Sequence, residues 1–120
     1  MTIGWGKPVG KTLIANLAIK YFRQNGYKLE KDAVLEGFSG LPHRFDFVIR
    51  KGKEKHVILI KEWNRTVGVN MVINMDKASA DVGFSNPIMI SEKFSGHAKA
   101  YANRRGVTLL TRRAIMRMLG

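Results

Sequence analysis

The chain has 120 residues, 45% of them apolar, which suits one globular domain with a real core. Lysine and arginine number 21 against nine acids, and the resulting net charge of +12 favours a polyanionic partner. The sequence contains no cysteine and no apolar run of the roughly 18 residues that a membrane span needs, so it excludes disulfides, a cysteine nucleophile and a transmembrane helix.

The first half of the chain predicts one helix followed by three strands. Apolar residues recur at helical spacing over residues 13–25, with Thr12 as a candidate cap and Gly26 at the exit. A strand is expected over 27–35, and the glycine-rich residues 37–42 form a loop. Two further strands, 45–49 and 57–63, are joined by a turn at 51–54.

The second half alternates helices with short strands. We expect helices over 69–82, 94–105 and 112–119 and strands over 87–91 and 107–110, with Gly106 closing one helix and Thr111 capping the next. The element order α-β-β-β-α-β-α-β-α predicts an α/β domain with a mixed central sheet flanked by helices. One domain is expected over residues 1–120, of which 1–10 form a flexible N-terminal segment. Because the glycine-rich start has no apolar stretch like that of a signal peptide, we expect a cytoplasmic protein.

Two charged residues lie on otherwise apolar strands. Side chains alternate along a strand, so Leu59, Lys61 and Trp63 share one face, whereas Ile60 and Glu62 share the other. If the hairpin turns through 51–54, Asp46 lies opposite Leu59 and on the same face as Lys61. A one-residue slip or a bulge would break this geometry.

The pairing of Asp46 with Lys61 has two interpretations. The structural one is an ion pair that ties the hairpin together. The functional one is a metal site, in which the carboxylate holds a hard cation and the lysine orients or activates water and offsets phosphate charge. Glu36, before the glycine loop, and His43, three residues before Asp46, favour the second interpretation. They could complete the coordination of a cation or carry a proton.

A resemblance to a known family rests on these same residues. Asp46 and Lys61 match part of the PD-(D/E)xK motif of the restriction-endonuclease-like superfamily. The segment from Glu36 through Gly37, Ser39, Gly40 and His43 to Asp46 resembles the E-G-x-S-G-x-x-H-x-F-D stretch of archaeal Mrr-type endonucleases. The residues around 61–63 and the closing 88–110 segment resemble the same family, and the similarity runs from about residue 12 to residue 119.

The resemblance implies a DNA endonuclease that depends on Mg²⁺, for which Mn²⁺ may substitute. Asp46 and Glu36 would be the metal ligands, Lys61 the catalytic lysine, and His43 an orienting group or water relay. One position departs from the family pattern: Leu59 stands where an acid or a glutamine is expected two residues before the lysine, and leucine cannot ligate a cation. The alternatives are a degenerate site in a DNA-binding or protein-interaction module, and a Holliday-junction resolvase. Residues 13–22 lack the glutamate that resolvases usually carry on the first helix.

The C-terminal quarter is the most basic part of the chain. Residues 93–120 contain seven lysines or arginines and no acid, which predicts contacts with DNA phosphates. The residues expected to make them are Lys99, Arg104, Arg105, Arg112 and Arg113. A homodimer is also expected, because one unit of this size cuts one strand and spans little DNA.

Overall fold

The computed structural model describes residues 10–61 and 66–120, and the side chains from Leu13 onward within those ranges. Its element order matches the order expected from the sequence. The elements are α1 (Gly10–Gln24), β1 (Lys28–Glu36), β2 (Pro42–Lys51), β3 (Glu54–Lys61), α2 (Val69–Asp81), β4 (Ile88–Ser91), α3 (Gly96–Arg105), β5 (Thr108–Thr111) and α4 (Arg112–Leu119).

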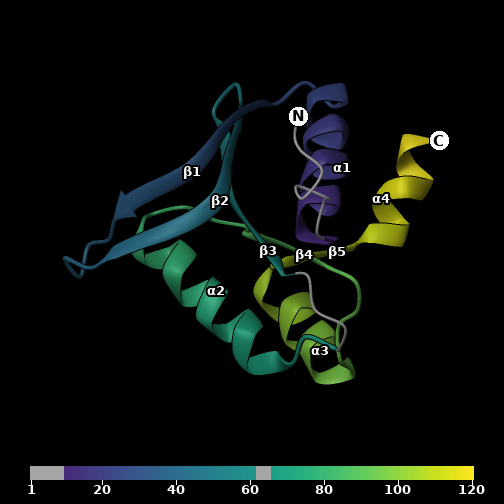
Figure 1. Ribbon diagram of the computed structural model, residues 1–120. Coiled ribbons are helices and arrows are strands. Elements are labelled where there is room, and N and C mark those ends of the chain that lie inside the picture. Colours follow the sequence, from purple (N-terminus) through teal and green to yellow (C-terminus); the bar gives the residue numbers. More distant parts are fainter. Residues whose placement is uncertain (1–9, 62–65) are drawn as a thin grey trace, which may run out of the picture.

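One mixed sheet organises the domain. Its strand order is β1-β2-β3-β4-β5, with antiparallel pairing from β1 to β3 and parallel pairing from β3 to β5. The parallel strands need crossover connections, and α2 and α3 supply them. The register joins Arg50 to Lys55 across the β2–β3 turn, as expected from the sequence. The α/β fold with a mixed sheet and flanking helices is therefore confirmed (Figure 1).

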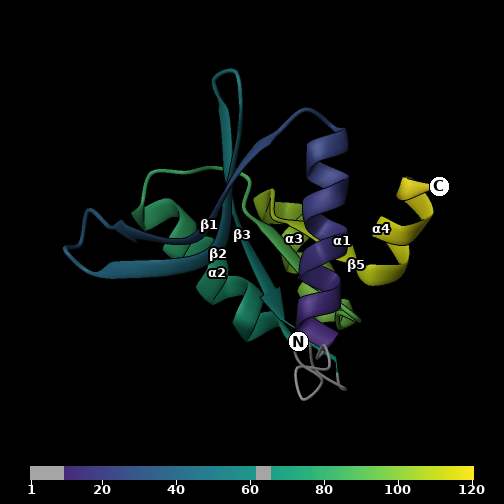
Figure 2. The same cartoon turned by 45° about the horizontal axis from the view of Figure 1, so that its top comes forward.

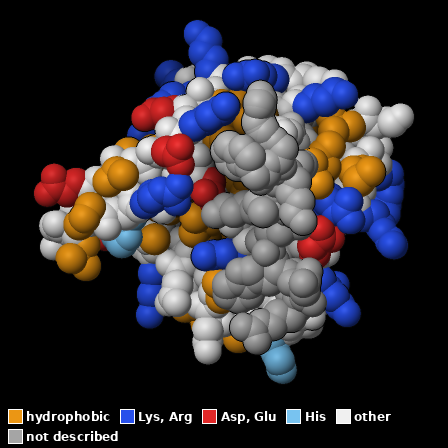
Figure 3. Space-filling view, viewed as in Figure 1, with side chains coloured by type: hydrophobic (Ala, Val, Ile, Leu, Met, Phe, Trp, Pro, Cys, Tyr) orange, Lys and Arg blue, Asp and Glu red, His pale blue; other side chains and the backbone are white. Residues whose placement is uncertain are grey.

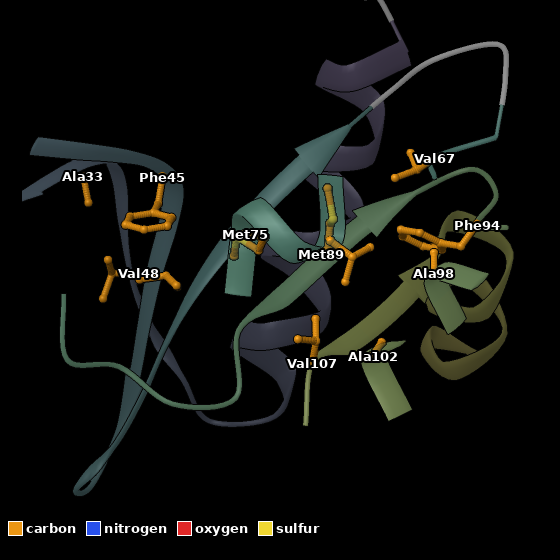
Figure 4. Packing of buried hydrophobic residues seen from close by; sticks show 12 residues of the cluster. Ala33, Phe45, Val48, Val67, Met75, Met89, Phe94, Ala98, Ala102 and Val107 are labelled. Atoms are coloured by element: carbon orange, nitrogen blue, oxygen red, sulfur yellow. The ribbon is translucent and has the colours of Figure 1, made fainter. Parts of the chain in front are cut away.

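The sheet separates two apolar clusters. Ala98 and Ala102 of α3 pack with Val72 and Met75 of α2 on one face of the sheet. Figure 4 shows Ala98 and Ala102 on the same side of the sheet as Met75 and Met89. On the other face, α1 and α4 pack against Ile58 and neighbouring isoleucines. Residues 57–60 of β3 carry apolar side chains to both faces, as expected for a strand in the middle of such a sheet.

Helix ends follow local chemistry. The hydroxyl oxygen of Ser95 accepts from the Ala98 amide at 3.1 Å, and that of Thr111 accepts from the Ala114 amide at the same distance. Gly106 ends α3 in the left-handed conformation, at φ 76°, which glycine adopts without steric cost. The predicted caps Thr111 and Gly106 are thus confirmed.

Several boundaries differ from the prediction. Helix α1 starts at Gly10, so Thr12 lies inside the helix and is not its cap. Phe94 is buried and bridges to Val67, which delays α3 until Gly96. Pro42 belongs to β2 as its first residue, a position that tolerates proline. The predicted strand end at 62–63 and residues 1–9 lie outside the described residues.

The two hairpins of the antiparallel half extend in different directions. Figure 2 shows the β2–β3 turn and the β1–β2 loop projecting separately from the body, with β2 taking part in both. Strand β2 must therefore change direction along its length. Within the described ranges, none of the helices combines the length and the apolar character needed to cross a membrane.

Candidate active site

Asp46 lies where the β2–β3 ladder stops. The ladder runs from Lys51–Glu54 to Phe47–Ile58, and Asp46 is the next residue of β2. Its carboxylate oxygen Oδ2 accepts a hydrogen bond from the backbone amide of Ile60 at 2.8 Å. Asp46 is 8% exposed and is therefore buried, although its Oδ1 is 3.6 Å from Nη1 of Arg44. The carboxylate thus takes the place of a backbone carbonyl as the acceptor for a β3 amide, and it stays close to the Arg44 guanidinium.

The strand is irregular at this point. Pairing of β1 with β2 passes from Lys31–Phe47 to Ala33–Phe45, and no pair joins Asp32 to Asp46. Asp32 has a positive φ of 51°, a backbone conformation that is uncommon for residues other than glycine. Phe45 packs in the cluster with α2, whereas Phe47 packs in the cluster with α1. Strict alternation would put both rings on one face, so β2 changes orientation next to Asp46.

A pocket of about 640 Å³ opens between α2 and the β2–β3 strands. Lys61, the last residue of β3, and Leu59 both line it, which confirms that these two side chains share a face. Ile60 packs in the cluster on the opposite face. Glu62 and Trp63 lie outside the described residues. We call this the α2 pocket; its other charged or imidazole-bearing lining residues are His43, Arg44, Lys77 and Asp81.

Asp81, at the end of α2, holds His43 and the β1–β2 loop. Its Oδ2 is 2.7 Å from His43 Nε2 and accepts from Ser39 Oγ at 2.6 Å, while its Oδ1 accepts from the Ser39 amide at 3.0 Å. The hydrogen bonds from the Ser39 hydroxyl and then from His43 hold the pKa of Asp81 below its ordinary value. Since an ionised carboxylate only accepts, Nε2 of His43 is the donor in this hydrogen bond.

Sequence reasoning did not identify Asp81, the shared partner of His43 and Ser39. Asp81 follows His43 by 38 residues, and only the fold brings them together. One signal was present: an acid in the last turn of a helix is unfavourable beside the negative end of the helix dipole, so a compensating partner is expected.

Glu36 is not brought to Asp46. It ends β1, is exposed, and pairs with Pro42, four residues from Asp46 along β2. Four residues of strand span roughly 13 Å, more than two carboxylates can bridge with one cation. Within residues 10–61 and 66–120, no three His, Asp or Glu side chains are grouped so that they could hold a metal ion. Asp46 alone fits a hard cation there, because Mg²⁺ is often held by one or two carboxylates together with waters and substrate phosphates.

The basic residues of the C-terminal quarter occupy two regions. Lys99, Arg104 and Arg105 lie on α3, which packs with α2, whereas Arg112 and Arg113 lie on α4, which packs with α1. Two of the five are in ion pairs: Arg105 with Asp76 at 3.2 Å and Arg112 with Glu92 at 2.8 Å. Figure 3 shows lysines and arginines spread around much of one face. The five residues therefore do not form one continuous patch.

The mixed sheet and its flanking helices have the fold of a restriction-endonuclease-like domain. The sequence profile of a restriction endonuclease family, Mrr_cat, matches residues 12–119, and the chain belongs to this family. None of the curated proteins matches the sequence.

Solved structures share the fold at low sequence identity. The protein of unknown function AF1548 has a TM-score of 0.77 at 18% identity, covering 89% of this chain and 66% of its own. Protein VC1899 from Vibrio cholerae has a TM-score of 0.67 at 11% identity, covering 90% and 30%. A repair endonuclease from Pyrococcus abyssi has a TM-score of 0.59 at 18% identity, covering 88% and 47%. The chain thus spans less than two thirds of each of these proteins.

Proposed function

We propose that the chain is an Mrr-type endonuclease that hydrolyses phosphodiester bonds of DNA with Mg²⁺, or with Mn²⁺ in its place. The observation that carries the proposal is the buried Asp46 carboxylate, held by the amide of Ile60, the residue before Lys61. A buried acid next to a lysine-lined pocket is costly for folding alone, and active sites concentrate such arrangements.

Each described residue has a separate role in the proposed reaction. Asp46 would hold the cation, whose chemistry is to neutralise phosphate charge and activate water. The Lys61 ammonium would orient the attacking water and offset the charge that develops on the phosphate. His43, which donates from Nε2 to Asp81, would orient or relay a water through Nδ1. Arg44 and Lys77 line the same pocket and would bind the flanking phosphates.

The test pairs a nicking assay with a binding assay. Asp46→Asn keeps the shape of the side chain but removes the charge, and Lys61→Ala removes the ammonium; each should abolish Mg²⁺-dependent nicking of supercoiled DNA. Affinity for DNA in chelator should change little. Lys53→Ala, in the exposed β2–β3 turn, is the matched control and should nick as the wild type does. A wild-type protein that nicks no supercoiled, linear, single-stranded or branched DNA contradicts the proposal.

Binding to DNA phosphates gives an independent measurement. Lys99, Arg104, Arg105, Arg112 and Arg113 are the proposed contacts outside the pocket. Each phosphate neutralised contributes about −0.9 to the slope of log affinity against log salt. Because α3 and α4 cover opposite faces, replacing the arginines of one helix should reduce that slope more than replacing those of the other. A homodimer would let a second copy use the other helix.

The second candidate is a DNA-binding module with a degenerate site. Leu59 favours it, because this partly buried side chain packs against the apolar cluster that α2 and α3 share, and it lines the pocket beside Lys61. Leu59→Glu separates the two candidates. In a nuclease, the added carboxylate should tighten Mn²⁺ binding and raise cleavage. In a binding module whose pocket faces no cation, a folded Leu59→Glu protein should bind Mn²⁺ no better than the wild type.

A further inference from the structure

The loop between β1 and β2 exposes two large apolar side chains. Phe38 is 86% exposed and Leu41 is 61% exposed, and both belong to the short segment 37–41. Figure 3 shows an apolar patch at the left end of the molecule, where Figure 1 places this loop. Apolar side chains that stay together in solvent at a projecting tip are a mark of an interaction surface.

The loop is held in one conformation. All five backbone amides of residues 37–41 donate hydrogen bonds, and those of Phe38 and Ser39 both donate to Asp81, at 2.8 Å and 3.0 Å. The Phe38 ring lies close to Gly83, since a Cβ there would be 3.3 Å from the ring atoms. A contact made by a preorganised loop costs less ordering on binding than one made by a flexible loop.

The neighbours of the loop indicate the chemistry of its partner. Asp81 holds the loop and also lines the α2 pocket, so the apolar tip stands at the rim of that pocket. Three cations, Arg44, Lys61 and Lys77, line the same pocket. Proteins build sites for unstacked nucleic-acid bases from two parts: cations that bind the phosphate backbone, and an exposed aromatic ring beside them.

We propose that Phe38 and Leu41 form a wedge that contacts an unpaired or unstacked base while the flanking phosphates lie in the α2 pocket. The inference rests on the proposed function in taking DNA as the partner, but it needs no hydrolysis. It names a substrate class: DNA whose stacking is already interrupted, by a bulge, a gap or a single-stranded junction. Such DNA has less stacking energy to lose than an intact duplex.

The test is a binding measurement in chelator. Two labelled duplexes of equal length, one fully paired and one with an unpaired nucleotide at its centre, are titrated at fixed salt with the wild type and three variants. Phe38→Ala should weaken binding to the interrupted duplex roughly 5- to 150-fold, the range for one aromatic–base stack, and Leu41→Ala should weaken it less. Binding of Phe38→Ala to the paired duplex should change by less than about 3-fold. Its salt slope should stay constant, because no phosphate contact is lost.

Val34→Ala is the matched control. Val34 is an apolar residue of β1, 64% exposed, but it lies outside the loop, so its removal should leave both affinities unchanged. Unfolding midpoints of all variants should match the wild type, because each replaced side chain is exposed.

Three outcomes overturn the wedge. Phe38→Ala could leave both affinities unchanged, or weaken binding to both duplexes equally; either result would show that the ring does not distinguish interrupted from intact stacking. It could also convert a dimer to a monomer in sedimentation with DNA binding intact, in which case the loop joins two copies of the chain. If the wild type does not nick DNA but still binds the interrupted duplex more tightly than the paired one, the proposed hydrolysis is refuted and the proposed base contact is retained.

Discussion

The end of the β1–β2 hairpin and the helical half of the domain are stabilised in different ways. Around β4, α3 and α4, buried alanines and isoleucines pack on the sheet, and the helices carry caps of their own. At the hairpin end the apolar residues Phe38 and Leu41 face solvent, and Asp81 holds the loop to α2 by hydrogen bonds to its carboxylate and its backbone carbonyl. Burial stabilises the first region, whereas hydrogen bonds define the shape of the second.

The largest effect is expected from the buried half. Ile58→Ala removes a fully buried side chain and should lower the free energy of unfolding by about 2–5 kcal/mol. Leu41→Ser, at the hairpin end, should change it by no more than about 0.5 kcal/mol. Urea unfolding of both variants measures the contrast, and equal losses would show that the hairpin end is also held by burial.

The next effect concerns the contact between the loop and α2. A Cβ on Gly37 would lie 1.9 Å from Oδ2 of Asp81, which the hydrogen bonds from Ser39 and His43 keep in place. Gly37→Ala should therefore cost about 1–3 kcal/mol. Gly96→Ala is the control, because a Cβ there meets nothing within 4 Å. In the Gly37→Ala, Asp81→Ala double variant the two losses should not add, since the second change removes the obstacle created by the first.

A smaller effect is expected at the start of α4. Thr111→Ala removes the acceptor for the Ala114 amide and should cost about 1 kcal/mol. Thr111→Ser retains the hydroxyl and should recover most of the loss. Thermal unfolding of the three proteins measures the difference, and identical midpoints would mean that solvent replaces the cap.

The smallest effect is the pH dependence of the hairpin end. The folded-state pKa of Asp81 is lowered from its ordinary 3.8, first by the Ser39 hydrogen bond and then by that of His43. A lowered pKa contributes stability above the unfolded-state value, and this contribution is lost as the pH falls through 3.8 and then through the folded-state pKa. Asp81→Asn should therefore be less stable than the wild type at pH 7, and the gap should narrow at pH 3. A gap that stays constant would contradict the assignment.

Most of the fold could be predicted from the sequence, because periodic apolar residues and glycine positions mark the elements. The β2–β3 register followed from the turn at 51–54, and the opposite faces of Leu59 and Ile60 followed from alternation. Alternation failed at Asp46, where β2 changes orientation between Phe45 and Phe47. A side-chain hydrogen bond to the neighbouring strand replaces the ladder there, and no pattern within β2 signals it.

The candidate site was predictable only in part, for a similar reason. Asp46 and Lys61 stand out as charges in apolar strands, so each could be found from its own strand. Glu36 was grouped with them by closeness in sequence, but the register carries it four residues along β2 from Asp46. Asp81 and Ser39 belong to contacts 42 residues apart, which neither local pattern nor spacing can reveal.

The packing of α1 against α4 links the two most distant described helices of the chain. Their apolar cluster includes Ile14 and Ile115, so it closes across about a hundred residues, whereas the cluster on α2 and α3 draws on residues 33–107. Closing the longer loop has the higher entropic cost, and contacts at long sequence separation form late. During synthesis the α2–α3 face, which carries the pocket, can therefore assemble before α4 has emerged from the ribosome and packed against α1.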